Sequence, residues 1–395
     1  MKRKVRHRLV LRLTAFDNLN IIEAESLTQK YSEEEMIMGN VPKTMKALVA
    51  YGINDYRLET DYPAPVCGDD DIIIKTEGCG ICAGDLKCQH GVQRFWGDGK
   101  SESFVKPPFI PGHEFFGRIV EMGKNVTGYS LGERVIADQI VPCGKCRFCK
   151  TGRYSLCQPH DVFGFKNYLN GGMAEYVRYP STTVIHRLPE DMKFEDAVCV
   201  EPYSCSKHAV DRAQITNEDI VVLAGAGTLG LGMVTYMRMK NPAKLIVLGH
   251  GKNRLAKAKE FGADIVMNPE EEDAYSLIMD LTDGYGCDVY IEATGNPVSV
   301  NQGMRLIRKQ GRFVEFSVMG GDTTIDWSVI GDEKELDIYG VHLSPYCFDF
   351  VIDRIYKGEL KTDGIVSSVF AIEDWEEAFR HATGKQGDYK VAFKF

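Results

Sequence analysis

The stretch that most constrains the fold is a glycine turn between an apolar run and a helical pattern. DIVVLA is followed by GAGTLG, in which Gly225, Gly227 and Gly230 have the spacing of a dinucleotide-binding turn. The first glycine permits a tight turn, the second lets a pyrophosphate approach the backbone, and the third allows close helix–strand packing. The alternative is a plain strand–helix turn, but the strand before the motif and the helix after it favour a cofactor site. The sequence therefore predicts a Rossmann unit that binds a dinucleotide.

The pattern of apolar segments changes once along the chain. Residues 203–344 alternate short apolar strands with amphipathic helices, which predicts a doubly wound parallel sheet. Residues 45–202 instead contain short strands separated by Gly- and Asp-rich breaks, which predicts a β-rich domain with long loops. We expect residues 345–395, which close with KVAFKF, to return to that first domain. The predicted fold class is α/β plus β.

Residues 1–44 precede the folded pattern. Six Lys and Arg residues occur there before the first acidic residue, Asp17. We expect an N-terminal extension that is disordered or reflects a misassigned start. A transit peptide is the alternative, although such peptides are usually Ser-rich and no serine occurs before Ser26.

The net charge and the placement of the cysteines indicate which partners and which cellular compartment to expect. The net charge of −9 argues against a nucleic-acid partner, and no apolar run is long enough to span a bilayer. We therefore expect neither a nucleic acid nor a membrane as a partner. Four of the 12 cysteines cluster between residues 143 and 157, which is typical of metal binding in a reducing compartment. The expected location is cytoplasmic.

The clustered cysteines follow the spacing C-x2-C-x2-C-x7-C. They are Cys143, Cys146, Cys149 and Cys157. The short gaps let one loop wrap an ion, and thiolate sulfur suits zinc in a closed tetrahedral site. We expect a structural zinc; an iron–sulfur cluster or four free thiols are the alternatives.

Three short motifs supply a second set of possible metal ligands. They are GICAGD with Cys82 and Asp85, PGHEFFG with His113 and Glu114, and VEPYSC with Glu201. Each motif alone is weak, because a lone Cys or His is more often a packed residue than a ligand. Their order, together with the cysteine lobe and the glycine turn, resembles that of the zinc-dependent medium-chain alcohol and polyol dehydrogenases. The resemblance covers nearly all of residues 45–395.

This resemblance implies a GroES-like catalytic domain, a Rossmann cofactor domain and pairing into a homodimer or homotetramer. It also implies a catalytic zinc held by Cys82, His113 and a glutamate, which is Glu114, Glu201 or the two in exchange. Asp85 would orient a ligand. An alcohol at the open coordination position of such a zinc loses its proton more easily, and hydride passes to nicotinamide. The Glu-Pro pair that begins at Glu201 matches the sorbitol dehydrogenase branch.

One position departs from the family pattern. The second residue after the zinc cysteine is commonly Ser or Thr, which passes the substrate proton toward solvent, and here it is Gly84. The proton therefore needs another route, through water with Lys87 or His90. A solvated loop side chain is the alternative interpretation of both residues.

The cofactor's adenosine ribose should meet the chain about 20 residues beyond the glycine turn, where an NAD enzyme places an acid. That place holds Gly249, followed by His250, Lys252 and Arg254. A missing carboxylate removes repulsion of a 2′-phosphate, and the basic residues offer it positive charge. We therefore expect NADP rather than NAD. The alternative is an ordinary basic start to a solvated helix, which does not explain the missing acid.

Longer segments, among them GICAGDLKCQHG, DEKELDIYG and HLSPYC, are similar to the erythritol/L-threitol type of bacterial polyol dehydrogenases. This similarity implies oxidation of a short polyol at a secondary hydroxyl to a ketose. Phe95 and Trp96 would shape the substrate cleft, with simple core packing as the alternative. A general secondary-alcohol, ketone or aldehyde reductase is the rival enzyme. A dinucleotide-binding protein without activity is the rival class, but it has no need of Cys82, His113 and the two glutamates.

Overall fold

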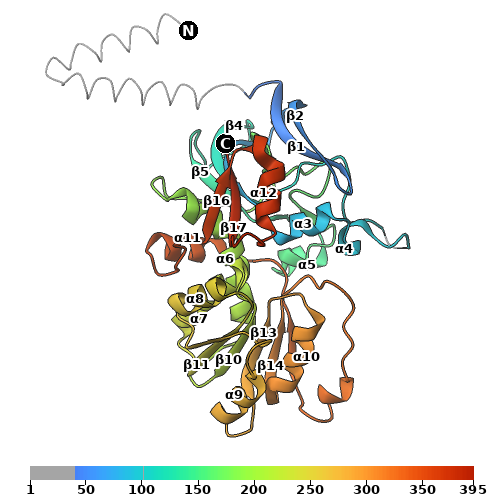
Figure 1. The fold of residues 1–395 in the computed structure, drawn as a ribbon. Helices are drawn as coiled ribbons and strands as arrows, with labels where there is room; N and C mark the ends of the chain where they lie inside the picture. Colours follow the sequence, from blue (N-terminus) through green and yellow to red (C-terminus); the bar gives the residue numbers. More distant parts are fainter. Residues whose placement is uncertain (1–40, 101) are drawn as a thin grey trace, which may run out of the picture.

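The computed structural model describes residues 41–100 and 102–395 (Figure 1). The predicted extension over residues 1–44 lies outside the described residues except for its last four positions. In the described part, two sheets occupy opposite halves of the molecule, and a long helix, α6 (Phe194–Arg212), lies between them (Figure 1). No helix in these two ranges is long and apolar enough to cross a membrane.

The cofactor half contains a six-stranded parallel sheet with the order β12-β11-β10-β13-β14-β15. Its strands are β10 (Ile220–Ala224), β11 (Lys244–Leu248), β12 (Ile265–Met267), β13 (Cys287–Glu292), β14 (Ile307–Glu315) and β15 (Asp337–Gly340). The chain runs outward from β10 through β11 to β12, and then returns to the other side of β10 and continues through β13, β14 and β15. This is the doubly wound arrangement. The crevice at such a turning point is where these sheets bind ligands.

Alternate residues of β10 pack on opposite faces of this sheet. Val221 and Leu223 join the apolar cluster that includes α6, whereas Val222 and Ala224 join a second cluster on the other face. Both faces are covered by helices, so the strand is apolar throughout, as parallel strands require. The helices of this half are α7 (Thr228–Lys240), α8 (Lys252–Phe261), α9 (Ala274–Leu281), α10 (Pro297–Leu306) and the short 3₁₀ helix η2 (Trp327–Val329). Helix α11 (Phe348–Tyr356) packs beside α6, and its Phe348 ring stacks on His186 of the catalytic half at 4.9 Å.

The catalytic half contains a seven-stranded sheet with the order β16-β17-β3-β4-β5-β9, in which β8 also pairs with β3. Its strands are β3 (Ile72–Gly80), β4 (Glu114–Met122), β5 (Arg134–Ala137), β8 (Tyr176–Tyr179), β9 (Ile185–Arg187), β16 (Val366–Phe370) and β17 (Lys390–Lys394). The C-terminal strand β17 runs antiparallel to β3, more than 300 residues earlier in the chain. This pairing brings the tail beside the loop that follows β3.

Smaller elements complete the catalytic half. Two hairpin-like pairs lie outside the large sheet, namely β1 (Thr44–Gly52) with β2 (Asp55–Pro63) and β6 (Ile140–Val141) with β7 (Asp161–Val162). The helical elements are α3 (Ala83–Gln89), α4 (Gln93–Trp96), α5 (Arg147–Lys150), α12 (Trp375–Ala382), η1 (Tyr154–Leu156) and η3 (Ile372–Asp374).

The two halves share an apolar core along α6. One continuous buried cluster includes Phe116 of β4, Ile136 of β5, and Val221 of β10. Residues 202 and 203, the limit expected from the sequence, lie inside α6 rather than in a linker. The change in sequence pattern after Glu201 therefore coincides with a helix that serves both halves.

Candidate active site and cofactor turn

Cys82 and Asp85 are held at the start of α3. The Cys82 thiol accepts a hydrogen bond from the backbone N–H of Gly84 at 3.4 Å, and Asp85 Oδ2 accepts from the backbone N–H of Cys82 at 2.9 Å. This reciprocal pair is a capping box, which satisfies backbone donors that a helix start leaves free. It also fixes the thiol at the end of β3 and buries the Asp85 carboxylate.

His113 and Glu114 lie directly before and at the start of β4, opposite Cys82. One ligand atom from each of Cys82, His113 and Glu114 lies within 4.8 Å of the others. Asp85 Oδ1 lies 3.6 Å from His113 Nδ1, and neither buried atom has a hydrogen bond. A sulfur, a ring nitrogen and a carboxylate oxygen form a donor set that zinc accepts, and an acid behind the histidine is a usual means of orienting it. The residues present therefore fit a metal ion.

A buried lysine faces the same carboxylate. Lys390 of β17 forms an ion pair with Glu114 Oε2 and donates to the backbone carbonyl of Ile81 at 3.1 Å. Their side chains are only 5% and 2% exposed. Burial lowers the pKa of Lys390, but the negative charges of Glu114, Cys82 and Glu201 together outweigh it and raise that pKa above its usual value. Sequence patterns do not reveal this lysine, because β17 reaches the site only through its pairing with β3.

Glu201 lies on α6 and is buried near, but outside, the set of three. Its Oε1 accepts a hydrogen bond from Gln139 Nε2 at 2.6 Å and one from the Cys205 thiol at 3.5 Å. Burial, followed by the charge of Glu114, raises the pKa of Glu201 to about 7. A carboxylate with a raised pKa beside a second carboxylate is a feature of functional sites.

The four-cysteine lobe is folded around one point. The sulfur atoms of Cys143, Cys146, Cys149 and Cys157 lie within 4.8 Å of one another, and all four cysteines are free thiols. Backbone N–H groups of Cys149 and Gln158 each lie 3.5 Å from the Cys146 sulfur. These donors lower the pKa of Cys146 to about 6. Sulfurs arranged in this way fit a structural zinc rather than disulfides.

An aromatic wall extends from His113. The Phe165 ring lies 5.6 Å from the His113 ring and stacks on Phe95 at 5.5 Å. Phe95 is buried, and Trp96 is half-buried, with its indole N–H donating to Cys88 O at 2.7 Å. Phe95 therefore packs into the wall beside the site, whereas Trp96 is tied to α3.

The two residues considered for proton transfer have other partners. Lys87 Nζ donates to Val318 O at 2.6 Å, so it bridges α3 and the cofactor half. Burial lowers the pKa of Lys87. His90 Nδ1 lies 3.2 Å from Asn54 Oδ1. Gly84 lies nearer the site: a Cβ there would be 3.6 Å from the Cys82 sulfur.

The glycine turn joins β10 to α7 as the motif predicts. Gly225 has φ +118°, and a Cβ on Gly230 would lie 2.0 Å from the Gly225 carbonyl oxygen. Only glycine fits both positions, since one needs a left-handed backbone and the other a close approach. At Gly227 a Cβ would meet only an Arg254 guanidinium nitrogen, at 3.6 Å. The turn therefore leaves a backbone surface on which a phosphate can lie, beside an arginine.

The basic residues after β11 lie in different surroundings. The His250 side chain is 60% exposed and 3.7 Å from Glu270, and Lys252 is exposed. Arg254 alone points back toward the glycine turn. Gly249, by contrast, is crowded: a Cβ there would lie 3.1 Å from the Ala226 Cβ. The position lacks an acid, as noted from the sequence, but it has little spare room.

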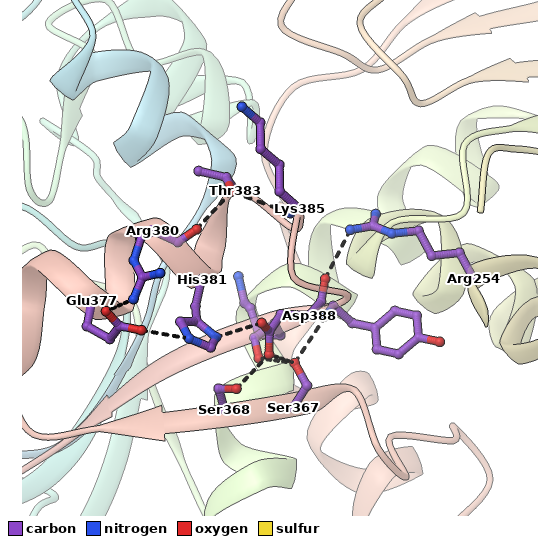
Figure 2. Close-up of polar contacts among 11 residues, drawn as sticks. Arg254, Ser367, Ser368, Glu377, Arg380, His381, Thr383, Lys385 and Asp388 are labelled. Carbon is purple, nitrogen blue, oxygen red and sulfur yellow. Dashed lines mark hydrogen bonds and ion pairs between the residues drawn. The ribbon is translucent and has the colours of Figure 1, made fainter. Parts of the chain in front are cut away.

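Arg254 also reaches the catalytic half. Its guanidinium donates to the Asp388 carbonyl at 3.0 Å, as Figure 2 shows. The Asp388 carboxylate in turn accepts from Ser367 at 2.8 Å and Ser368 at 2.6 Å, and lies 2.8 Å from His381 Nδ1 (Figure 2). This network fixes the loop before β17. Apart from Arg254, its members lie between residues 367 and 388, and no sequence motif marks them.

Comparison with known proteins agrees with this geometry. Residues 68–190 match the alcohol dehydrogenase GroES-like domain, and residues 228–357 match the zinc-binding dehydrogenase family. The chain is 46% identical to the erythritol/L-threitol dehydrogenase of Mycolicibacterium smegmatis, over 89% of this chain and 98% of that protein. It belongs to the zinc-dependent medium-chain alcohol and polyol dehydrogenases. The resemblance, the fold class and the enzyme class inferred from the sequence are thereby confirmed.

Other members of this dehydrogenase family differ in what they act on or bind. The D-arabitol-phosphate dehydrogenase of Enterococcus avium is 32% identical, over 85% of this chain and 94% of that protein. A zinc-binding dehydrogenase structure from Sinorhizobium meliloti, bound to NADP, is 27% identical with a TM-score of 0.80, covering 90% of this chain and all of that one. An NADH complex from E. coli has the same identity and a TM-score of 0.78, covering 90% of this chain and 100% of that chain. These relatives support a nicotinamide cofactor without separating NADP from NAD.

Proposed function

We propose that this dehydrogenase oxidises a short polyol, a tetritol such as erythritol or threitol, at a secondary hydroxyl to a ketose, with zinc and NADP. The observation that carries the proposal is the convergence of Cys82, His113 and Glu114 at one point beside the Phe165 wall. The 46% identity to an erythritol/L-threitol dehydrogenase supports the choice of substrate.

The catalytic zinc would be held by Cys82 and His113 with Glu114, and Glu201 is the second carboxylate within the same buried region. When bound, zinc supplies a Lewis acid that eases removal of the alcohol proton. Asp85 would hold the imidazole of His113 in one orientation through Nδ1. The four-cysteine lobe would hold the second, structural zinc.

The choice of NADP rests on Gly249 and Arg254. The end of β11 lacks an acid that would repel a 2′-phosphate, and Arg254 lies beside Gly227 of the phosphate-binding turn. Arg254 uses one of its five N–H donors on Asp388 O, which leaves others for a phosphate. His250 and Lys252, which are exposed beside the end of β11, would contribute further positive charge.

We also propose the domain organisation read from the sequence, with residues 45–202 and 345–395 forming the catalytic domain and residues 203–344 the cofactor domain. The pairing of β17 with β3 supports the return of the tail. Assembly as a homodimer or homotetramer and a cytoplasmic location complete the proposal.

Parallel assays of erythritol, threitol, pentitols, 2-butanol and the matching ketoses with NAD and NADP test this function. We expect the tetritols to have the highest kcat/KM and NADP to be preferred. Equal rates on tetritols and simple alcohols would favour the general alcohol or ketone reductase instead.

A pair of cysteine variants tests the metal mechanism. Cys82→Ser should abolish turnover and lower the zinc content, because it removes the sulfur ligand. Cys67→Ser is the matched control, since Cys67 lies in a loop and its thiol only donates to backbone carbonyls. If Cys82→Ser keeps full turnover, the proposed zinc site is wrong.

A further inference from the structure

Two histidines from distant parts of the chain face each other across the two halves. His160 follows the four-cysteine lobe, and His342 follows β15 of the cofactor sheet. Their Nε2 atoms lie 3.0 Å apart, and the two rings meet edge to face at 4.8 Å. Both side chains are half-buried. Neither histidine was proposed as a site residue from the sequence, although His342 begins the HLSPYC segment.

The pair lies at the outer end of the aromatic wall that begins at His113. Phe165, next to His113, lies 5.4 Å from Phe104, and Phe104 lies 5.4 Å from the His160 ring. His342 comes two residues after the carboxyl end of β15, and ligands of doubly wound sheets bind beyond the carboxyl ends of the strands. The two imidazoles therefore contact each other at the end of the aromatic wall that is farthest from His113.

The backbone holds both rings in fixed positions. His160 has φ +54°, and Leu343, next to His342, has φ +53°, which is an uncommon conformation for residues other than glycine. The Leu343 carbonyl accepts from His208 Nδ1 at 2.8 Å. Ser344 donates to Gln139, the residue that also contacts Glu201. Unusual backbone conformations held by their surroundings are concentrated at ligand sites.

The chemistry of the pair suits a hydroxyl group. Each neutral imidazole has one donor and one acceptor nitrogen, and among the described residues neither Nδ1 atom has a hydrogen-bond partner. Burial, with the charges of His160 and Arg94, lowers the pKa of His342 to about 4. The neighbouring wall of Phe95, Phe104 and Phe165 offers no hydrogen bond, and a hydroxyl buried there without a partner is costly.

We propose that His160 and His342 form the subsite that binds the polyol hydroxyl group farthest from the reacting carbon. This inference rests on the proposed polyol oxidation and specifies which residues give it chain-length and hydroxyl specificity. The distal hydroxyl would exchange hydrogen bonds with the imidazole pair while the reacting hydroxyl lies at Cys82 and His113. A four-carbon alcohol without the distal hydroxyl would make no hydrogen bond to the two histidines.

The test compares two substrates of equal carbon number in the zinc-loaded, full-length enzyme. His342→Leu should lower kcat/KM for erythritol or threitol at least tenfold, mainly through KM, and change kcat/KM for 2-butanol less than threefold. His342→Gln should recover part of the tetritol activity, because an amide again donates and accepts. Asn167→Leu, an exposed residue in the turn that follows Phe165, is the control and should leave both substrates unaffected.

The outcomes separate the subsite from the proposed function. Parallel losses on tetritol and 2-butanol would mean that the pair only supports the fold, and unchanged rates on both would mean that it binds no hydroxyl; either result overturns the inference. Wild-type enzyme that oxidises 2-butanol but no tetritol would overturn the polyol function itself, and the subsite with it.

Discussion

Gly249→Asp is the change that most directly tests how this enzyme selects its cofactor. It restores a carboxylate at the end of β11, where an NAD enzyme binds the adenosine ribose. The structure shows that the new side chain must also find room, because its Cβ would lie 3.1 Å from the Ala226 Cβ. Charge and crowding therefore act together in this variant and must be separated.

The charge effect has a calculable size. A carboxylate about 5 Å from a doubly charged 2′-phosphate in water is repelled by about 1.7 kcal/mol. Because about 1.4 kcal/mol changes an equilibrium tenfold, NADP binding should weaken roughly 15-fold from charge alone. NAD does not carry the phosphate, and the new acid can accept from its ribose hydroxyls.

Gly249→Ala provides the matched control, since it adds the same Cβ without the charge. We expect the ratio of kcat/KM for NADP to that for NAD to fall about tenfold or more in Gly249→Asp relative to Gly249→Ala, measured at low ionic strength with saturating polyol. Added salt should shrink the difference. The reasoning is refuted if the two variants have the same ratio, or if the wild type already prefers NAD strongly.

Three further changes test the other parts of the site. Gly230→Ala should crowd the Gly225 carbonyl, disturb the turn by about 1–3 kcal/mol and raise the KM for the cofactor, checked by steady-state kinetics with circular dichroism as the fold control. Cys146→Ser should reduce bound zinc from two ions per chain to one and lower the melting temperature, measured by elemental analysis and calorimetry. Lys390→Met should reduce the free energy of unfolding of the metal-free protein by about 3–5 kcal/mol in urea titrations, because it leaves the Glu114 carboxylate buried without its positive partner. Lys394→Met, exposed on the same strand, should have little effect.

The parts of the site that the sequence predicts are those encoded within short segments. The glycine turn needs particular residues at fixed spacing because the backbone itself makes the contacts, and the cysteine lobe wraps one point with a single loop. Neither depends on how distant strands pair. Local motifs of this kind can therefore be read before the fold is known.

The parts that could not be predicted depend on the pairing of distant strands. Lys390 reaches Glu114 only because β17 adds to the edge of β3 in one register, and a register is not visible in either strand alone. The contact of Gln139 with Glu201 and that of His160 with His342 likewise join segments from different elements. The sequence offered Glu114 and Glu201 as equal candidates, and the structure groups Glu114 with Cys82 and His113.

Three consecutive residues, Asp388, Tyr389 and Lys390, lead into β17 and connect the proposed metal ligands to the cofactor turn. Lys390 is paired with Glu114, the Tyr389 carbonyl accepts from Thr228 at the start of α7 at 2.7 Å, and the Asp388 carbonyl accepts from Arg254. A shift of this segment would therefore move the carboxylate beside the metal ligands and the arginine beside the glycine turn together. Because the Asp388 side chain is tied down by two serines and a histidine, the segment is held rigidly in the catalytic half (Figure 2). We infer that this rigidity keeps the cofactor turn and the metal ligands at the fixed separation that hydride transfer requires, since small displacements of reacting groups greatly reduce rates.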